Sequence, residues 1–241
     1  MTTIKVNGIL TLAALAVALA FSLACAPSTN RGQGSESTTV TRSDTTSVPA
    51  RAAPPDSNIT RADLGRIQGS PDAPIWVIEV SDFQCPFCKQ WHDQTYAAFR
   101  DQFVKTGKVR LAYVNFPLAS HQYAWPAAEA AMCASAQTKF WPMHDALFAT
   151  QARWETTANP TVVFDSLAQA NHLDMTRWRE CVTSGKMKSL IEADHDRASR
   201  AGANATPSFM IGDKILAGAQ SLAELQQAID SALVKSKKSA P

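Results

Sequence analysis

The sequence predicts an α/β fold in which a long helical stretch interrupts a small sheet. Three observations predict it. The apolar run Ile75–Val80 has the length and composition of a strand buried on both faces. A second strand is predicted at Val109–Val114, and residues 120–202 then follow a helical pattern. Two short apolar runs finally flank Gly212-Asp213, which is the signal of a two-residue hairpin.

Composition excludes several function classes. The chain has 241 residues, 45% of them hydrophobic, which is enough for a sizeable core. Its formal charge of +2 gives no reason to expect a nucleic acid or an acidic partner. Because no phosphate loop, nucleotide fingerprint or metal-spaced pair of histidines occurs, we expect no cofactor and no metal. The histidines are scattered, at positions 92, 121, 144, 172 and 195. His121 is a candidate neighbour of the active site, and Asp194-His195-Asp196 is expected to be a solvated helix face.

Residues 1–24 have the composition of a signal peptide. Lys5 is their sole charge, and the uncharged stretch after it is slightly long for a signal-peptide core and short for a membrane span. Ser22–Cys25 resembles the lipobox of bacterial lipoproteins, which predicts lipidation of Cys25. Ordinary cleavage after Ala26 and a retained anchor are the alternatives. All three place the remainder of the chain outside the cytoplasm.

Residues 25–61 are predicted to be a disordered tether that leads to a folded domain at 62–241. Ser, Thr, Pro, Arg and Gly dominate this stretch, and it has almost no large apolar residues. It therefore cannot bury enough surface to offset the entropy of ordering. Its r.m.s. reach of roughly 30–35 Å would hold the domain near a membrane, with the N-terminal anchor as the only membrane contact.

Two cysteines, Cys85 and Cys88, lie where the first strand ends and a helix begins. Pro86 fits the first helical position because its missing N–H would have no partner there, so Cys85 is predicted to be the N-cap. Helix N-termini and C-x-x-C motifs lower a thiol pKa from about 8.5 to roughly 3.5–7.5. Cys88 lies one turn further on, on the buried face, and suits a resolving thiol. The pair is a candidate redox disulfide.

Three alternatives to a redox disulfide stay open for this pair. They are a structural disulfide, half of a zinc site, and a C-x-x-C that arose by chance. No second C-x-x-C or paired Cys/His motif completes the four ligands of a zinc site. The helix that follows supports the redox interpretation, because its inner-face residues recur at steps of three and four. They are Cys88, Trp91, Thr95, Phe99 and Phe103.

Glu79 lies inside the first predicted strand, six residues before Cys85. A carboxyl in an apolar strand costs free energy unless it is paired or has a function. Burial raises a carboxyl pKa, which suits proton exchange with Cys88 as the disulfide opens. The alternative is a carboxyl at a sheet edge, bonded to backbone or to a lysine.

The cysteine count predicts a second disulfide. Five cysteines leave one unpaired, and lipidation of Cys25 would remove it. Cys133 and Cys181 then remain as a pair, each in a separate predicted helix and facing its neighbours. The alternative is two buried free cysteines that act as small apolar residues.

These motifs, taken in order, resemble the DsbA family of oxidoreductases, especially its extracytoplasmic bacterial members. The likeness rests on the Cys85–Cys88 turn, the helical insertion, and Thr206-Pro207 before a hairpin and a last helix. It implies a thioredoxin fold with an inserted all-helical domain. It also implies a cis peptide before Pro207 that lines the substrate site with Thr206, Pro86 and Phe87. Glu79 matches the acidic residue of that family.

The resemblance implies a thiol:disulfide oxidoreductase that acts on cysteine-containing extracytoplasmic proteins and is recharged by a membrane redox partner. Oxidation is favoured, because the tether cannot form the dimerisation domain of dimeric isomerases, and we expect a monomer. Phe87 departs from the pattern, since the strongest oxidants of the family carry His there, and predicts a milder oxidant. Specific reduction, isomerisation, and a non-catalytic peptide-binding module are the alternatives.

Overall fold

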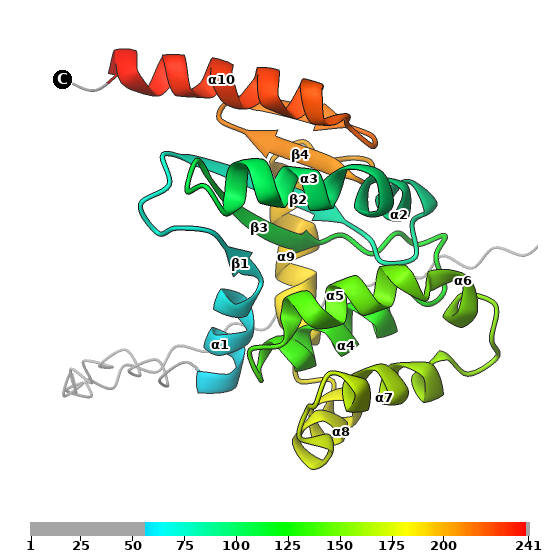
Figure 1. The fold of residues 1–241 in the computed structure, drawn as a ribbon. Helices are drawn as coiled ribbons and strands as arrows, with labels where there is room; N and C mark the ends of the chain where they lie inside the picture. Colours follow the sequence, from blue (N-terminus) through cyan, green and yellow to red (C-terminus); the bar gives the residue numbers. More distant parts are fainter. Residues whose placement is uncertain (1–55, 240–241) are drawn as a thin grey trace, which may run out of the picture. The chain divides into compact units, whose positions relative to one another are not determined.

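A computed structural model describes residues 56–239 and contains one five-stranded sheet with helices on both faces (Figure 1). The strand order is β1-β3-β2-β4-β5. β2 and β3 run parallel, and the other neighbouring pairs are antiparallel. The α/β class and the interruption of the sheet by helices are confirmed. The strands are β1 (Ile67–Gln68), β2 (Ile75–Ser81), β3 (Val109–Asn115), β4 (Ser208–Ile211) and β5 (Lys214–Ala217).

The central strand β2 is less fully buried than its apolar sequence predicts. Trp76 is 42% exposed, and its ring lies under the guanidinium of Arg110 on β3. Val77 and Glu79 point to the opposite face and are completely buried. One face of this strand is therefore buried, while the other is exposed to solvent at the N-terminal end of the strand.

The helix that follows the cysteines is continuous but contains two wide π turns. Four-residue steps, such as those between Trp91, Thr95, Phe99 and Phe103, exceed the 3.6 residues of an α-helical turn and would drift off the buried face. The π turns absorb this excess, and all four residues are buried. The segments are α2 (Pro86–Trp91), η1 (His92–Tyr96), α3 (Ala97–Phe99) and η2 (Arg100–Val104).

Six helices separate β3 from β4, in the place where the sequence predicts the insertion. They are α4 (Ala124–Ser135), α5 (Phe140–Ala149), α6 (Gln151–Trp154), α7 (Pro160–Ala170), α8 (Met175–Ser184) and α9 (Lys188–Arg200). Helices α4 to α8 share one core with Cys85 and Cys88. Helix α9 returns across the sheet, where Ala198 packs with Val80 (Figure 1). The insertion therefore forms part of the surroundings of the cysteines.

The last helix, α10 (Leu222–Ser239), packs on the same face of the sheet as α2 and α3. Ser221 and Glu224 form a capping box at its start, because the Ser221 backbone N–H donates to Glu224 Oε2 at 2.8 Å. Among the residues that the structure describes, no helix combines the length and the apolar character that a membrane crossing requires.

The expectation that Asp194-His195-Asp196 is a solvated face is wrong for its first member. Asp194 is completely buried and pairs with Arg66, which is 5% exposed. The same carboxylate accepts a bond from Asn115 Nδ2 at 2.9 Å. Because a buried charge needs a partner, this cluster joins α9 to the end of β3.

The predicted boundary between tether and domain is also wrong, because a helix begins before it. Helix α1 (Ser57–Gly65) starts inside the predicted tether, and Asp56 caps it by accepting the Asn58 N–H at 2.8 Å. Ala62 is completely buried, and its carbonyl accepts a bond from Ser135 Oγ at 2.6 Å. The polar composition of this segment does not predict a helix, because contacts with α4 rather than local sequence order it. The predicted leader, Cys25 and most of the tether lie outside the described residues.

Candidate active site

The two cysteines lie at the turn from β2 to α2, with Cys85 as the N-cap and Pro86 as the first helical residue. The Cys85 N–H donates to the Asp82 carbonyl at 3.1 Å, and the Cys85 carbonyl accepts the Lys89 N–H at 3.1 Å. The turn is therefore bonded on both sides of Cys85. Pro86 and Phe87 are exposed, and the Phe87 side chain is 60% exposed beside the thiols.

Both cysteines are free thiols in this structure, and their surroundings differ. A bond from the Cys88 thiol, together with the backbone N–H groups of Phe87 and Cys88, outweighs burial and lowers the pKa of Cys85 to about 6. Burial raises the pKa of Cys88 well above its ordinary value, and the neighbouring Cys85 sulfur adds to this effect. At neutral pH the pair therefore holds one thiolate, on Cys85, and one thiol, on Cys88.

Access of solvent and partners to Cys85 is narrow. The residue is only 3% exposed, and Cys88 is completely buried. A partner therefore reaches Cys85 through the small area that its N-cap position leaves open.

The peptide bond between Thr206 and Pro207 is cis and lies beside Cys85. The Cys85 Sγ lies 3.4 Å from the Thr206 carbonyl oxygen, across 121 positions of sequence, and donates to it when Cys85 is protonated. The Pro207 carbonyl accepts the Gly218 N–H at 2.8 Å, which ties this turn to the end of β5. The structure thus brings Thr206 and Pro207 to the thiols, where the resemblance places them.

Glu79 is completely buried on the face of β2 that packs against the active-site helix. Neither carboxylate oxygen has a hydrogen-bond partner within residues 56–239. Burial raises the pKa of Glu79 to about 8, although the nearby Ser81 hydroxyl and the positive potential of His92 act in the opposite direction. The alternative of a sheet-edge carboxyl fails, because β2 is an inner strand.

Asp82 and His121 form a hydrogen-bonded pair beside the thiols. The sequence does not indicate this pair, because the two residues are far apart in the chain. Asp82 is 2% exposed, and His121 Nδ1 lies 2.7 Å from its Oδ2. The Asp82 N–H donates a hydrogen bond to Cys88 Sγ at 3.5 Å. Its carboxylate also accepts the N–H groups of Gln84 and Leu118, at 2.7 and 2.9 Å. His121, a candidate neighbour by its position, thus contacts the active-site turn through Asp82.

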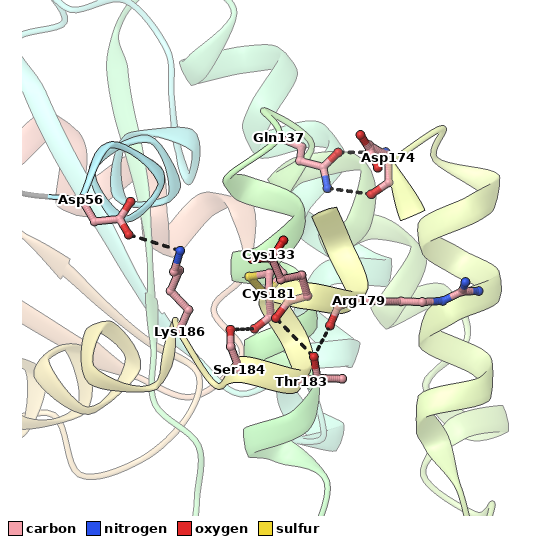
Figure 2. Close-up of a disulfide and its surroundings, with 10 residues drawn as sticks. Asp56, Cys133, Gln137, Asp174, Arg179, Cys181, Thr183, Ser184 and Lys186 are labelled. Atoms are coloured by element: carbon pink, nitrogen blue, oxygen red, sulfur yellow. Dashed lines mark hydrogen bonds and ion pairs between the residues drawn. A yellow bond between two sulfur atoms is a disulfide. The ribbon is translucent and has the colours of Figure 1, made fainter. Parts of the chain in front are cut away.

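Cys133 and Cys181 are joined as a disulfide between α4 and α8, with Cα atoms 5.8 Å apart (Figure 2). Around it, Gln137 and Asp174 exchange two bonds, in which Gln137 Nε2 donates at 3.2 Å and the Asp174 N–H donates at 2.9 Å. Lys186 pairs with Asp56 at 3.3 Å. These contacts hold the outer helices to α4 and α1, away from the redox turn.

The structure also brings together two of the histidines that lie scattered along the sequence. His92 follows Cys88 by one turn of helix, and His144 and Asp145 lie on α5. The two imidazole rings have centroids 5.4 Å apart, and both contact Asp145. A signal was present in the sequence, since each histidine is followed directly by an aspartate.

Comparisons with known proteins agree with this geometry. Residues 62–231 match the family described as Thioredoxin. The chain is 27% identical over 173 residues to the probable disulfide bond formation protein D of Bacillus anthracis, covering 69% of this chain and 77% of that protein. Its fold is similar to the crystal structure of alpha-DsbA1 of Wolbachia pipientis, with a TM-score of 0.63 and 23% identity, covering 71% of this chain and 92% of that chain.

A further relative carries a different name. The chain is 32% identical over 178 residues to the Na(+)/H(+) antiporter NhaA 3 of Salinispora tropica, covering 73% of this chain. The chain spans only about a quarter of that protein's length, since the match covers 26% of it. The family match, the fold and the redox turn agree with one another over the described domain. The chain therefore belongs to the thioredoxin family, and it is similar there to a disulfide bond formation protein and to a DsbA structure.

Proposed function

We propose that the chain exchanges disulfides with secreted or envelope proteins through Cys85 and Cys88, and that its net direction is oxidation of client thiols. The observation that carries this proposal is the opposite shift of the two thiol pKa values. The pKa of Cys85 is lowered to about 6, while the pKa of Cys88 is raised well above its ordinary value. A thiolate is both the nucleophile and the better leaving group, so Cys85 faces clients and Cys88 serves the internal step.

The proposed cycle starts from the Cys85–Cys88 disulfide. A client thiolate attacks Cys85 Sγ, the bond between the cysteines breaks, and Cys88 leaves with the electron pair and takes up a proton. A second client thiolate then attacks the client sulfur of the mixed disulfide and releases Cys85 as a thiolate. The client gains a disulfide, the protein gains two electrons, and a membrane redox partner removes them.

Glu79 is proposed to deliver and recover the proton at Cys88. Its carboxyl titrates at about 8, close to neutral pH, so it gives its proton to the Cys88 thiolate when the disulfide opens and takes that proton back when the site is reoxidised. A buried water is the natural carrier between the two, since the carboxyl is buried and unpartnered in the described domain.

The direction of transfer follows from the stability of the reduced form. Lowering a thiol pKa from 9.0 to about 6 stabilises the reduced pair at neutral pH. This stabilisation makes the disulfide more oxidising, by on the order of 30 mV at pH 7. Phe87 supplies no positive charge that would add to this effect, so a mild oxidant is proposed.

The client chain is proposed to lie between Phe87 and the cis peptide before Pro207. The exposed Phe87 ring offers apolar contact, with Pro86 beside it. Thr206 and Pro207 present backbone next to Cys85, where an extended chain can pair with it. Recognition through backbone suits an enzyme that acts on many cysteine-containing sequences.

We further propose that the protein works outside the cytoplasm as a monomer, anchored by a lipid at Cys25. The leader composition supports export, and the Cys133–Cys181 disulfide suits an oxidising compartment. The tether then gives the domain its reach from the membrane.

One experiment separates the proposed oxidase from its alternatives. The full-length protein is equilibrated with glutathione buffers to measure the Cys85–Cys88 potential, and the oxidised protein is then mixed with a reduced, unfolded client. An oxidase shows a potential well above −300 mV and forms client disulfides. When a disulfide-containing client is used instead, the Cys85 thiolate of Cys88→Ala attacks the client disulfide and is expected to accumulate as a mixed disulfide, whereas Cys85→Ala, the matched control, forms none.

The other outcomes identify the alternatives. A potential near −270 mV, with electron flow toward client disulfides, indicates a reductase. Rearrangement of scrambled client disulfides without net oxidation indicates an isomerase. A potential below −300 mV without client turnover indicates a peptide-binding module and would overturn the catalytic proposal.

A further inference from the structure

The His92–His144–Asp145 cluster lies between the active-site helix and α5, and the proposed redox cycle does not use it. Asp145 Oδ1 is 2.8 Å from His144 Nδ1 and 3.4 Å from His92 Nε2. The three ligand atoms lie within 4.8 Å of one another. Two imidazoles and a carboxylate thus converge on one point from elements far apart in the sequence.

The two separations that involve Asp145 are close to those of a tetrahedral metal ion. Ligand atoms about 2.0–2.1 Å from zinc, at tetrahedral angles, are about 3.3–3.4 Å apart. The pair formed by His92 Nε2 and Asp145 Oδ1 already has this separation at 3.4 Å. The pair formed by His144 Nδ1 and Asp145 Oδ1, at 2.8 Å, needs to widen by only about half an ångström to reach it.

The atoms behind the first ligands also suit a metal. His92 Nδ1, on the far side of its ring, lies 3.1 Å from Asp93 Oδ1. Asp93 is held in turn by Lys89 Nζ at 2.8 Å. A metal-bound imidazole usually donates its other N–H to a carboxylate, which fixes the tautomer and the ring orientation. The structure provides this arrangement for His92.

His144 is completely buried, and its Nε2 has no hydrogen-bond partner in the part of the chain that the structure describes. With a metal on Nδ1, this nitrogen carries the proton. Four aromatic rings make T-shaped contacts with His144 and offer weak acceptors for such an N–H. These rings belong to Phe83, Tyr113, Trp141 and Phe148.

The cluster has a path to solvent. The Asp145 side chain is 42% exposed and that of His92 is 14% exposed, while His144 forms the buried base. A metal held by these three ligands therefore keeps one position open for water, as in three-ligand zinc sites.

We propose that His92, His144 and Asp145 form a binding site for a divalent transition metal, with zinc as the expected ion. Imidazole nitrogen with one carboxylate oxygen is a donor set that suits zinc. The ion would join the helix that carries Cys88 to the helical insertion. This proposal does not depend on the redox function, because it uses neither thiol.

The test uses the full-length protein with Cys85–Cys88 oxidised and any remaining thiol alkylated, so that no sulfur competes for metal. Zinc alone is titrated by calorimetry, and cobalt is used to read the ligand field. We expect one equivalent of zinc, a cobalt spectrum of tetrahedral nitrogen and oxygen ligands, and a raised melting temperature. His92→Gln and Asp145→Asn should lose this binding, with folding verified by circular dichroism.

Two further variants sharpen the result. Asp93→Asn should weaken zinc binding about 10–100-fold, as expected for a residue that orients a ligand. His195→Gln is the matched control, since His195 Nδ1 also lies near an aspartate, at 3.9 Å from Asp196, and is not part of the cluster. It should bind zinc like the wild type. Absence of a one-equivalent site, or equal binding by His92→Gln, would overturn the proposal and leave a hydrogen-bonded cluster only.

Discussion

Glu79 and Tyr113 are direct neighbours in the parallel pair of β2 and β3, and both are completely buried. The Glu79 carboxylate and the Tyr113 hydroxyl both lack a hydrogen-bond partner among residues 56–239, as does Ser81 Oγ two positions along β2. Unsatisfied buried polar atoms typically cost about 1–3 kcal/mol each. Their grouping behind Cys88 is the feature that most needs a function, and proton exchange with that thiol supplies one.

The first prediction concerns how Glu79 affects stability with pH. Its pKa rises from an ordinary 4.5 to about 8 on folding, so the folded state binds the extra proton between these values. The free energy of unfolding should therefore fall as pH rises from about 5 to 8, by on the order of a few kcal/mol. Glu79→Gln removes this decline and should be more stable than the wild type at pH 8, measured by urea denaturation.

At pH 3 to 3.5 the two proteins should have similar stability, because the carboxyl is then mostly neutral in both the folded and the unfolded state. Glu79→Gln should also slow the formation of mixed disulfides between clients and the oxidised protein at neutral pH, because Cys88 leaves and takes up its proton in that step. Parallel stability curves for the variant and the wild type from pH 4 to 8 would contradict a raised pKa for Glu79.

The second prediction concerns the ionisation of Cys85. Alkylation of the reduced protein should follow a single titration near pH 6 and modify Cys85, because Cys88 stays protonated. The potential of the pair should fall by about 59 mV per pH unit below pH 6, where two protons accompany two electrons, and by about 30 mV above it. A slope of 59 mV that persists to pH 8 would show an ordinary Cys85 pKa.

The same shift predicts how the reduced protein responds to pH. The pKa of Cys85 is depressed by folding, so its contribution to stability is complete above about pH 9 and disappears as pH falls through about 6. The stability of the reduced protein relative to the oxidised one should therefore increase from pH 6 to 9. Thermal melts of the two forms in parallel measure this difference.

The third prediction concerns Asp82 as a positioning residue. Its carboxylate accepts three bonds, from Gln84, Leu118 and His121. Asp82→Asn replaces one acceptor oxygen by an amide NH2 group and leaves the Leu118 N–H facing a donor. This change should lower the free energy of unfolding by about 1–3 kcal/mol.

The exposed Asp72 provides the matched control, because Asp72→Asn should change the stability little. Asp82→Asn should also alter the alkylation rate of Cys88, whose sulfur lies 3.5 Å from the Asp82 N–H. An Asp82 variant with unchanged stability and unchanged Cys88 reactivity would exclude this positioning role.

The fourth prediction concerns the second disulfide. Cys133 and Cys181 are 48 positions apart, and closing a loop of that length stabilises the fold by about 4 kcal/mol in the chain-entropy model. Cys133→Ala with Cys181→Ala should therefore lower the unfolding free energy by up to this amount. The Cys85–Cys88 potential should stay unchanged, since the bond joins α4 and α8 outside the redox turn. A shift in that potential would show that the two disulfides are coupled.

Much of the fold could be predicted because local patterns carry it. The apolar run of β2, Pro86 after Cys85, the turn at Gly212 and the capping box at Ser221 each specify their structure through neighbouring residues. The N-cap position of Cys85 follows from chain order alone. These features predict a redox turn between a strand and a helix.

Tertiary structure decided the features that depend on distant partners. Asp56 and α1 are ordered by packing on α4, so the polar composition of this segment wrongly predicts a disordered tether. Asp194 is buried because Arg66, 128 positions away, pairs with it. His92 and His144 meet because the insertion folds back on the active-site helix. Sequence by itself determined where the reactive thiols are and which local structure holds them. The pKa values, the polar atoms behind Cys88 and the histidine cluster were decided only by long-range packing, since burial and charge separation are properties of the assembled fold.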